Sequence, residues 1–228
     1  MTDSIVSLQT ISGVWRASEG LHLHQSRTPT GFAHLDTVLG GGFPQHGLVR
    51  IRSLTGIGEL TFLTRSLGHR QSQRLVAFIN PPGLISQTWL SQCKLSSAQT
   101  LIVYPDSVID SLWAAEQCIK SEACHCVVIW ADQISPKQAR RLQVAATQHQ
   151  VLCVMYESQS SSRQALPVTL DLEIHRQSDQ LNIEVTKQTG SWPGHHTSIR
   201  LAHTPTNQAI YHAMSQYAGR PQETHSVI

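Results

Sequence analysis

Short apolar stretches alternate with amphipathic stretches between residues 48 and 156, and this alternation constrains the fold more than any other feature of the sequence. The apolar stretches are rich in β-branched residues and, apart from the first, lack a polar face, which is typical of strands buried on both sides. They span residues 48–53, 74–80, 100–104, 125–130 and 151–156. Helical periodicity fills the intervals, at 58–69, 84–93, 108–120 and 136–150. This order predicts an α/β fold with a mainly parallel central sheet flanked by helices.

A different pattern follows residue 168. Residues 168–174 and 181–186 alternate apolar and polar side chains around a polar turn at 177–180, which predicts a C-terminal antiparallel hairpin. Residues 198–202 are a candidate for a third strand. The chain then divides into an N-terminal extension (1–28), a core (29–202) and a polar C-terminal tail (203–228).

Charged residues are scarce, since only 14% of the 228 residues are Asp, Glu, Lys or Arg, and the net charge is +2. This balance excludes an acidic solvating protein and a polybasic DNA-packaging protein. Five irregularly spaced cysteines argue against a secreted disulfide scaffold. No signal-peptide pattern opens the sequence, and the longest apolar run, residues 126–131, is far shorter than the roughly 18 residues of a membrane helix. We therefore expect a cytoplasmic protein without membrane contact.

The segment before the first strand combines a short helix with a glycine turn. Thr30 is placed to cap this helix, and three glycines at 40–42 followed by Pro44 end it. The apolar face of the helix consists of Phe32, Leu35, Val38 and Leu39.

Residues 53–61 connect the first strand to the first helix of the sheet, the place where open α/β sheets bind phosphates. A nucleotide-binding loop there reads GxxxxGK[ST]: its glycines expose backbone N–H groups, its lysine neutralises the phosphates and its hydroxyl binds magnesium. The residues of this loop that matter for the comparison are Ser53, Gly56, Gly58, Glu59 and Leu60.

The loop retains glycines of a nucleotide-binding loop but lacks the side chains that bind phosphate and magnesium. Ser53 replaces the first glycine, and Glu59 stands at the lysine position, where a carboxylate repels a triphosphate. Leu60 stands at the hydroxyl position and cannot bind magnesium. The loop therefore predicts a degenerate P-loop that holds no nucleotide.

The other parts of a nucleotide site are also missing. Asn80, Pro81 and Pro82 follow the second strand, where an ATPase places an activating glutamate. Asp132 follows the fourth strand, and without a lysine or hydroxyl partner we interpret it as a turn or cap residue. We expect no catalytic residue, no cofactor and no enzymatic activity.

The Cys124-His125-Cys126 triplet does not fit a zinc site, which needs a wider cysteine pair and two further ligands. Alternation along a strand places both thiols on one face and His125 on the other, so we interpret the cysteines as buried structural residues and expect no metal. Trp113 and Trp130 belong to one helix–strand unit and are expected in the core.

Several basic residues and one tryptophan are candidates for partner binding. Three basic residues of the 136–150 helix share one exposed face, which is either a solvated surface or a face that binds a partner protein or nucleic acid. Two arginines of the first strand lie on one side of it, which indicates a sheet edge or a face covered by an acidic partner. The tryptophan lies at a strand end. These candidates are Lys137, Arg140, Arg141, Arg50, Arg52 and Trp192.

The segment TGFAHLDTVLGGGFPQHGLVRIRSLTGIGEL, beginning at Thr30, resembles the entry to a RecA-type core, and its GIGEL loop resembles the ImuA family. Four later segments resemble the same family in the same order: FINPP, LWAAEQCIKSEACHCVVIW, ARRLQVAA and KQTGSWPG. Gln188 and Thr189 depart from a pattern that is often basic. The resemblance covers about residues 12–202 and implies a RecA-like P-loop NTPase-type core.

The resemblance also implies a function, that of a non-enzymatic RecA-like adaptor in SOS-induced translesion synthesis. The implied partners are an ImuB-like protein, RecA and an error-prone DNA polymerase III alpha paralogue, and weak direct contact with DNA stays open. Residues 75–156 also resemble SulA, the SOS cell-division inhibitor that binds FtsZ, which is the alternative function. The N-terminal TGF–GGG block is absent from SulA and favours the ImuA family.

Overall fold

The computed structural model describes residues 26–68, 74–159, 164–190 and 194–200. Nearly all of the expected N-terminal extension and the whole expected tail at 203–228 lie outside these residues.

The strands form the centre of the molecule. Their bounds are β1 (Arg27–Thr28), β2 (Phe43–Pro44), β3 (Gly47–Ser53), β4 (Leu75–Ile79), β5 (Thr100–Val103), β6 (Cys124–Trp130), β7 (Leu152–Ser158), β8 (Leu170–Gln177), β9 (Gln180–Gln188) and β10 (His195–Arg200). β1 and β2 pair separately, and the other eight form one sheet in the order β10-β9-β8-β3-β7-β6-β4-β5. Pairing is parallel from β8 to β5 and antiparallel from β8 to β10, which confirms the predicted fold class. The hairpin extends the central sheet, because β8 pairs with β3.

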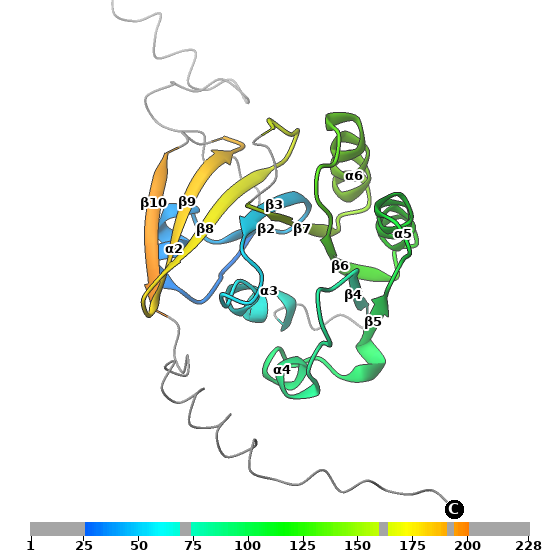
Figure 1. Cartoon of the computed structure of the whole chain (residues 1–228), viewed down its shortest axis with the longest axis horizontal. Coiled ribbons are helices and arrows are strands. Elements are labelled where there is room, and N and C mark those ends of the chain that lie inside the picture. Colours follow the sequence, from blue (N-terminus) through cyan, green and yellow to red (C-terminus); the bar gives the residue numbers. More distant parts are fainter. Residues whose placement is uncertain (1–25, 69–73, 160–163, 191–193, 201–228) are drawn as a thin grey trace, which may run out of the picture.

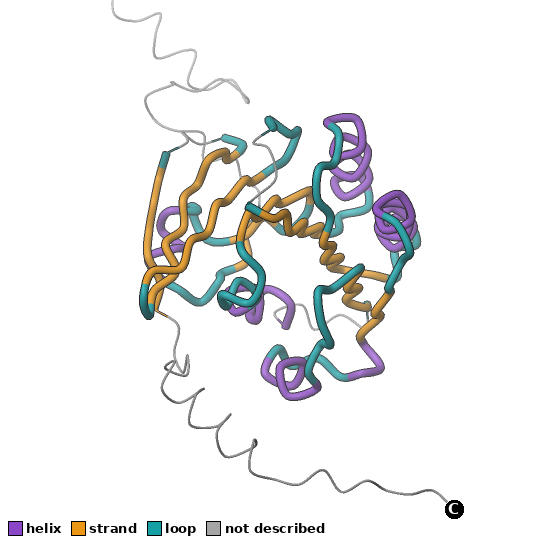
Figure 2. The backbone as a smooth tube through the Cα atoms, viewed as in Figure 1, coloured by secondary structure: helices purple, strands orange, loops and turns teal. Residues whose placement is uncertain are grey.

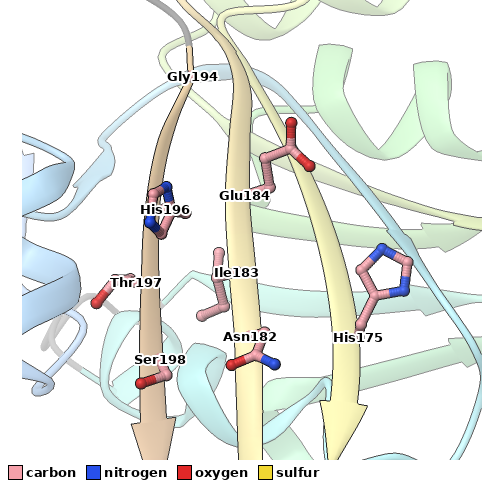
Figure 3. A pocket seen from close by; sticks show the side chains of 8 residues that line it. All are labelled: His175, Asn182, Ile183, Glu184, Gly194, His196, Thr197 and Ser198. Atoms are coloured by element: carbon pink, nitrogen blue, oxygen red, sulfur yellow. The ribbon is translucent and has the colours of Figure 1, made fainter.

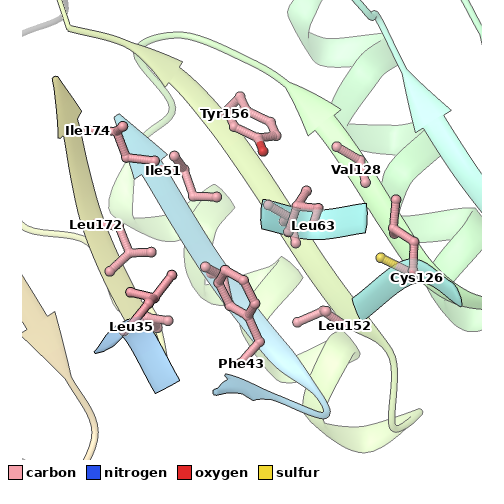
Figure 4. Close-up of a cluster of buried hydrophobic side chains, with 14 of the residues drawn as sticks. Leu35, Phe43, Ile51, Leu63, Cys126, Val128, Leu152, Tyr156, Leu172 and Ile174 are labelled. Carbon is pink, nitrogen blue, oxygen red and sulfur yellow. The ribbon is translucent and has the colours of Figure 1, made fainter. Parts of the chain in front are cut away.

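Helices cover both faces of this sheet (Figures 1 and 2). Their bounds are α2 (Ala33–Val38), α3 (Thr64–Gly68), α4 (Gln87–Gln92), α5 (Val108–Lys120) and α6 (Pro136–Gln148), with short 3₁₀ turns η3 (Thr61–Leu63) and η4 (Ser97–Gln99). α5 and α6 pack on one face through buried residues that include Leu112, Ile119 and Leu142. α2, α3 and α4 contribute Leu35, Leu67 and Leu90 to the opposite face. Figure 4 shows part of this second cluster, in which residues from β3, β6, β7 and β8 meet Leu35 and Leu63.

The two long helices begin where the sequence predicts. The Ser135 hydroxyl accepts the N–H of Gln138 at 3.3 Å, and the Gln138 side chain accepts the N–H of Ser135 at 2.8 Å, which forms a capping box before Pro136. The Ser107 hydroxyl accepts the N–H of Asp110 at 3.1 Å and starts α5 in the same way.

The N-terminal block differs in detail from the prediction. Thr30 is not the cap of α2, because Phe32 precedes the helix. The Thr30 hydroxyl instead accepts the N–H of Phe32 at 3.2 Å and donates to Asp36 at 2.7 Å, tying the entry segment to the helix. Gly42 has a φ of 116°, and a Cβ there would lie 2.1 Å from the Thr28 carbonyl oxygen, so the turn requires glycine at this position.

The expectation that Cys124 and Cys126 share one face is wrong. The register between β4 and β6 shifts at this point, since Leu75 pairs with Cys124 and the next residue, Val76, pairs with Cys126. This irregularity puts Cys124 in the cluster under α5 and Cys126 in the opposite cluster. Both thiols are buried, as predicted, and His125 lies between carbonyl oxygens of Arg74 and Leu67.

Arg50 and Arg52 do not mark a sheet edge, because β3 lies between β7 and β8 in the middle of the sheet. The Arg50 guanidinium contacts both oxygens of Asp171 on β8 and lies 3.2 Å from Glu157 on β7. Arg52 lies 3.8 Å from Glu157, and both arginines are at most 5% exposed. A buried charge must be paired, so acids of this chain, and not of a partner, explain the two arginines.

We expect Arg50→Met to lower the free energy of unfolding by about 3–5 kcal/mol, because it leaves Asp171 buried without its counter-charge and leaves Glu157 with Arg52 alone. Urea unfolding monitored by circular dichroism measures the loss. The matched control is Arg200→Met, which removes an exposed ion pair to Asp179 and should cost at most about 1 kcal/mol. Equal losses in the two variants would contradict this role of the buried network.

Candidate functional site

A cavity of about 270 Å³ lies where β3, β4, β6 and β7 end, at the edge where an open α/β sheet binds its ligands. It is smaller than the roughly 300–1,000 Å³ of typical small-molecule pockets. The residues around it combine acids, aromatic rings and small polar side chains. They are Ser53, Thr55, Glu59, Asn80, Pro82, Val108, Trp130, Ala131, Asp132, Tyr156, Glu157 and Ser158.

The carboxylate of Glu59 lies against the backbone N–H groups of the 53–60 loop, for which the sequence predicts a degenerate P-loop. Both of its oxygens lie 3.1 Å from the N–H of Gly56, and one lies 3.1 Å from the N–H of Gly58. These glycines have φ values of 84° and 98°, a left-handed conformation, and their two N–H groups point at the same carboxylate; we call this pair of donors the nest. Glu59 is only 4% exposed. The buried N–H groups of the nest therefore have a carboxylate of the same loop as their acceptor.

Contacts from distant strands hold the loop in this shape. The Tyr156 hydroxyl on β7 donates to the Glu59 carbonyl oxygen at 3.0 Å, and Arg176 of β8 donates to the Ile57 carbonyl oxygen at 3.2 Å. The Tyr156 ring stacks on Trp130 with centroids 5.2 Å apart. Burial, together with the nearby charge of Glu59, raises the pKa of Tyr156 well above its usual range, so the hydroxyl stays a donor.

The predicted helix at 58–69 is shorter in the structure and begins later, with η3 at Thr61 and α3 at Thr64. The side chain of Glu59 turns back to the nest, and residues 58–60 therefore belong to the loop. Leu60, at the hydroxyl position, packs against the apolar cluster on the α3 face. Ser53, at the first glycine position, ends β3 and is buried.

The two other acids of the cavity, Glu157 and Asp132, are engaged with partners inside the chain. Burial raises the pKa of Glu157, although Arg50 and Arg52 lower it in part. Asp132 accepts the N–H of Ser158 at 2.6 Å and thereby ties the end of β6 to the end of β7, a contact between strands that the interpretation as a turn or cap residue did not include. In the described part of the chain, no group of three His, Cys, Asp or Glu residues could hold a metal ion. The arrangement offers acids and a filled nest, which is a poor environment for a nucleotide.

The three basic candidates of α6, Lys137, Arg140 and Arg141, are exposed as predicted. Arg141 crosses to α5 and pairs with Glu116, which also binds Lys120 at 2.6 Å. These cations lower the pKa of Glu116, with the hydrogen bond from Lys120 as the main cause. The sixth candidate, Trp192, lies outside the described residues.

The sequence analysis did not predict the exposed apolar face of α5. Trp113 was expected in the core, yet it is 62% exposed, and Ile109 one turn earlier is 72% exposed. Trp130, the other tryptophan of this unit, is buried as expected. The helical period contained the signal: α5 buries Leu112, Ala115 and Ile119, and this stripe excludes position 113. A groove of about 150 Å³ between α5 and α6 separates the exposed pair from Arg141.

A second hollow, of about 510 Å³, lies on the polar face of β8, β9 and β10 (Figure 3). His175, Glu184 and His196 line it from three adjacent strands. The neighbouring Glu173 lies 3.5 Å from His175 and also reaches Arg52. The lining side chains of this hollow are mostly small and polar, with Glu184 as the one carboxylate, and they indicate no particular ligand.

No protein-family model matches the chain. The chain is 25% identical to protein RecA of Picosynechococcus sp. (strain ATCC 27264 / PCC 7002 / PR-6) over 117 residues, which are 51% of this chain and about a third (34%) of that RecA. Among solved structures, the RadB recombinase superposes with a TM-score of 0.59 at 13% identity, covering 77% of this chain and 96% of that one. SulA from Pseudomonas aeruginosa superposes with a TM-score of 0.42 at 22% identity, covering 49% and 97%. The RadB likeness shows a RecA-like fold.

The helices of the described residues are all too short or too polar to cross a membrane.

We expect Glu59→Ala to destabilise the protein by about 1–3 kcal/mol, because it leaves the N–H groups of Gly56 and Gly58 without their acceptor. The matched control is Glu122→Ala, which removes a carboxylate that is 72% exposed and should change stability by at most about 0.5 kcal/mol. Urea unfolding of both variants measures the difference. If Glu59→Ala is no less stable than the control, the carboxylate does not hold the loop.

Proposed function

We propose that this chain is a non-enzymatic RecA-like adaptor of the SOS-induced translesion synthesis machinery. The observation that carries the proposal is the Glu59 carboxylate in the nest of Gly56 and Gly58, the position that a nucleotide phosphate takes in a working P-loop. The similarity to RecA supports the recombination-related fold. The resemblance of five sequence segments to the ImuA family supports the finer assignment.

An adaptor of this kind acts through its surface. The proposed partners are an ImuB-like protein, RecA and an error-prone DNA polymerase III alpha paralogue. Because Arg50 and Arg52 are paired inside the sheet, they are no longer candidates for this contact, and the exposed face of α5 and α6 replaces them. We define the α5–α6 face by Ile109, Trp113, Lys137, Arg140 and Arg141.

The composition of the α5–α6 face fits an acidic segment of a partner protein with one apolar anchor. Ile109 and Trp113 border a groove of about 150 Å³, which accommodates an apolar side chain. The two helices carry four cations, Lys120, Lys137, Arg140 and Arg141, against two acids, Asp110 and Glu116, so their net charge is positive. Lys120 and Arg141 pair with Glu116. Exposed aromatic and arginine side chains of this type are enriched among residues that dominate binding energy.

The alternative function is a SulA-like inhibitor of cell division that binds FtsZ. The sequence resemblance of residues 75–156 to SulA supports it, and these residues include all of α5 and α6. The two functions differ in the partner that the chain binds, and the fold does not distinguish between them.

We expect the tagged full-length chain, purified from DNA-damaged cells, to recover an ImuB-like protein or RecA. Trp113→Ala should weaken this binding at least tenfold, about 1.4 kcal/mol, because it removes the largest exposed apolar side chain of the α5–α6 face. Leu54→Ala truncates another exposed apolar residue, in the 53–60 loop, and should leave binding unchanged.

Titration of the purified partner with the wild-type chain and with each of the two variants measures the affinities. Recovery of neither protein would contradict the adaptor function. Filamentous growth on overexpression, together with inhibition of FtsZ assembly in vitro, would replace it with the alternative.

A further inference from the structure

Two cysteine thiols meet at the turn that joins α5 to β6. Cys118 lies in the last turn of α5 and Cys124 is the first residue of β6. Cys124 belongs to the buried cluster under α5, and Cys118 packs against the same cluster, so the two side chains lie next to each other. The hydroxyl of Ser121 donates to the Cys118 carbonyl oxygen at 2.9 Å and accepts the N–H of Ala123 at 3.3 Å. These bonds hold the helix end and the strand start together, so the contact between the thiols is built into the turn.

The two thiols differ in exposure and acidity. Cys118 is partly exposed, whereas Cys124 is buried. The hydrogen bond with Cys124 lowers the pKa of Cys118 to about 7, although partial burial opposes this, and the same contact raises the pKa of Cys124 well above its usual range. A partly exposed thiol with a low pKa is the form of cysteine that reacts with oxidants and electrophiles.

The other described cysteines lack this combination. Cys93 is buried, and burial raises its pKa to about 11. Cys153 is fully buried on β7, and burial raises its pKa further. Cys126 lies on the opposite face of the sheet from Cys124.

We propose that Cys118 and Cys124 form a reversible oxidation site, in which Cys118 reacts first with a peroxide and Cys124 then resolves it to a disulfide. This site is independent of the proposed adaptor function, since it rests on the thiols and the turn alone.

The chemistry balances with hydrogen peroxide as the oxidant. The Cys118 thiolate attacks one peroxide oxygen; an S–O bond forms, the O–O bond breaks, and the departing hydroxide takes a proton and becomes water. The Cys124 sulfur then attacks the Cys118 sulfur, an S–S bond forms and the S–O bond breaks, and the thiol proton of Cys124 leaves with the hydroxide as a second water. Two thiols are oxidised by two electrons and one peroxide is reduced to two waters.

The product would be a short covalent link from the last turn of α5 to the start of β6. It closes a ring that contains Ser121 and Ala123, whose hydrogen bonds already bring the two ends together. Oxidation would fix the C-terminal end of α5 to β6. The same helix carries Ile109 and Trp113 of the α5–α6 face.

The test treats the reduced full-length protein with hydrogen peroxide and maps the products by non-reducing peptide mass spectrometry. We expect a loss of two hydrogens and a peptide pair joined through Cys118 and Cys124, reversed by dithiothreitol. In a separate measurement, alkylation of Cys118 by iodoacetamide should rise with pH around 7, below the ordinary cysteine value of about 8.5.

Variants separate the two roles. Cys118→Ser should abolish the disulfide, and Cys124→Ser should leave a sulfenic acid on Cys118 that dimedone traps. Cys93→Ser is the control and should oxidise like the wild type. A different cysteine pairing, unchanged oxidation of Cys118→Ser, or no loss of mass in the wild-type protein would each overturn the proposal, and the wild-type map decides even if a variant fails to fold.

Discussion

The hydrogen bonds from the Gly56 and Gly58 N–H groups to the Glu59 carboxylate are the interaction on which the proposed role of this fold depends. Two left-handed glycines create a nest that favours an anion, and such a nest left empty and buried would have unsatisfied donors. The Glu59 carboxylate fills this nest. The following helix begins later than the sequence predicts, with η3 at Thr61, and the Glu59 carbonyl oxygen accepts a hydrogen bond from Tyr156. The 53–60 loop thus satisfies its own donors at the end of β3 in a RecA-like sheet.

The same sheet is held together by charge at its centre. Arg50 on β3 links β7 and β8 through Glu157 and Asp171. β8 is also the strand that pairs in parallel with β3 and antiparallel with β9, where the hairpin begins. The arginines of β3 are committed to internal contacts, so the proposed partner surface lies instead on α5 and α6. The α5–α6 face combines Ile109 and Trp113 with basic side chains, which suits protein contact better than catalysis.

Local patterns predicted the elements of the fold well. The apolar runs located every strand from β3 to β9 to within a few residues, and Ser107 and Ser135 marked the starts of α5 and α6, because capping depends on neighbours in sequence. Contacts between distant residues could not be predicted in this way. Arg50 and Asp171 are 121 positions apart, and their pairing follows only from the strand order.

The candidate site was predicted in part. The substitutions Glu59 and Leu60 were visible in the sequence as losses of nucleotide chemistry. That Glu59 turns into the nest was not visible, because it depends on the conformation of two glycines and on anchors from β7 and β8. The exposure of Trp113 was missed because the residue type, and not its place in the helical period, guided the expectation.

Isothermal titration of the full-length chain with ATP and magnesium tests the central claim most directly, namely that Glu59 fills the phosphate position. We expect no saturable binding to the wild-type protein, and weak binding to Glu59→Lys, which vacates the nest and restores the lysine of a nucleotide-binding loop. Glu122→Lys makes the same charge change at an exposed position and should bind no better than the wild type. Micromolar binding of ATP by the wild-type protein would show that Glu59 does not fill the phosphate position.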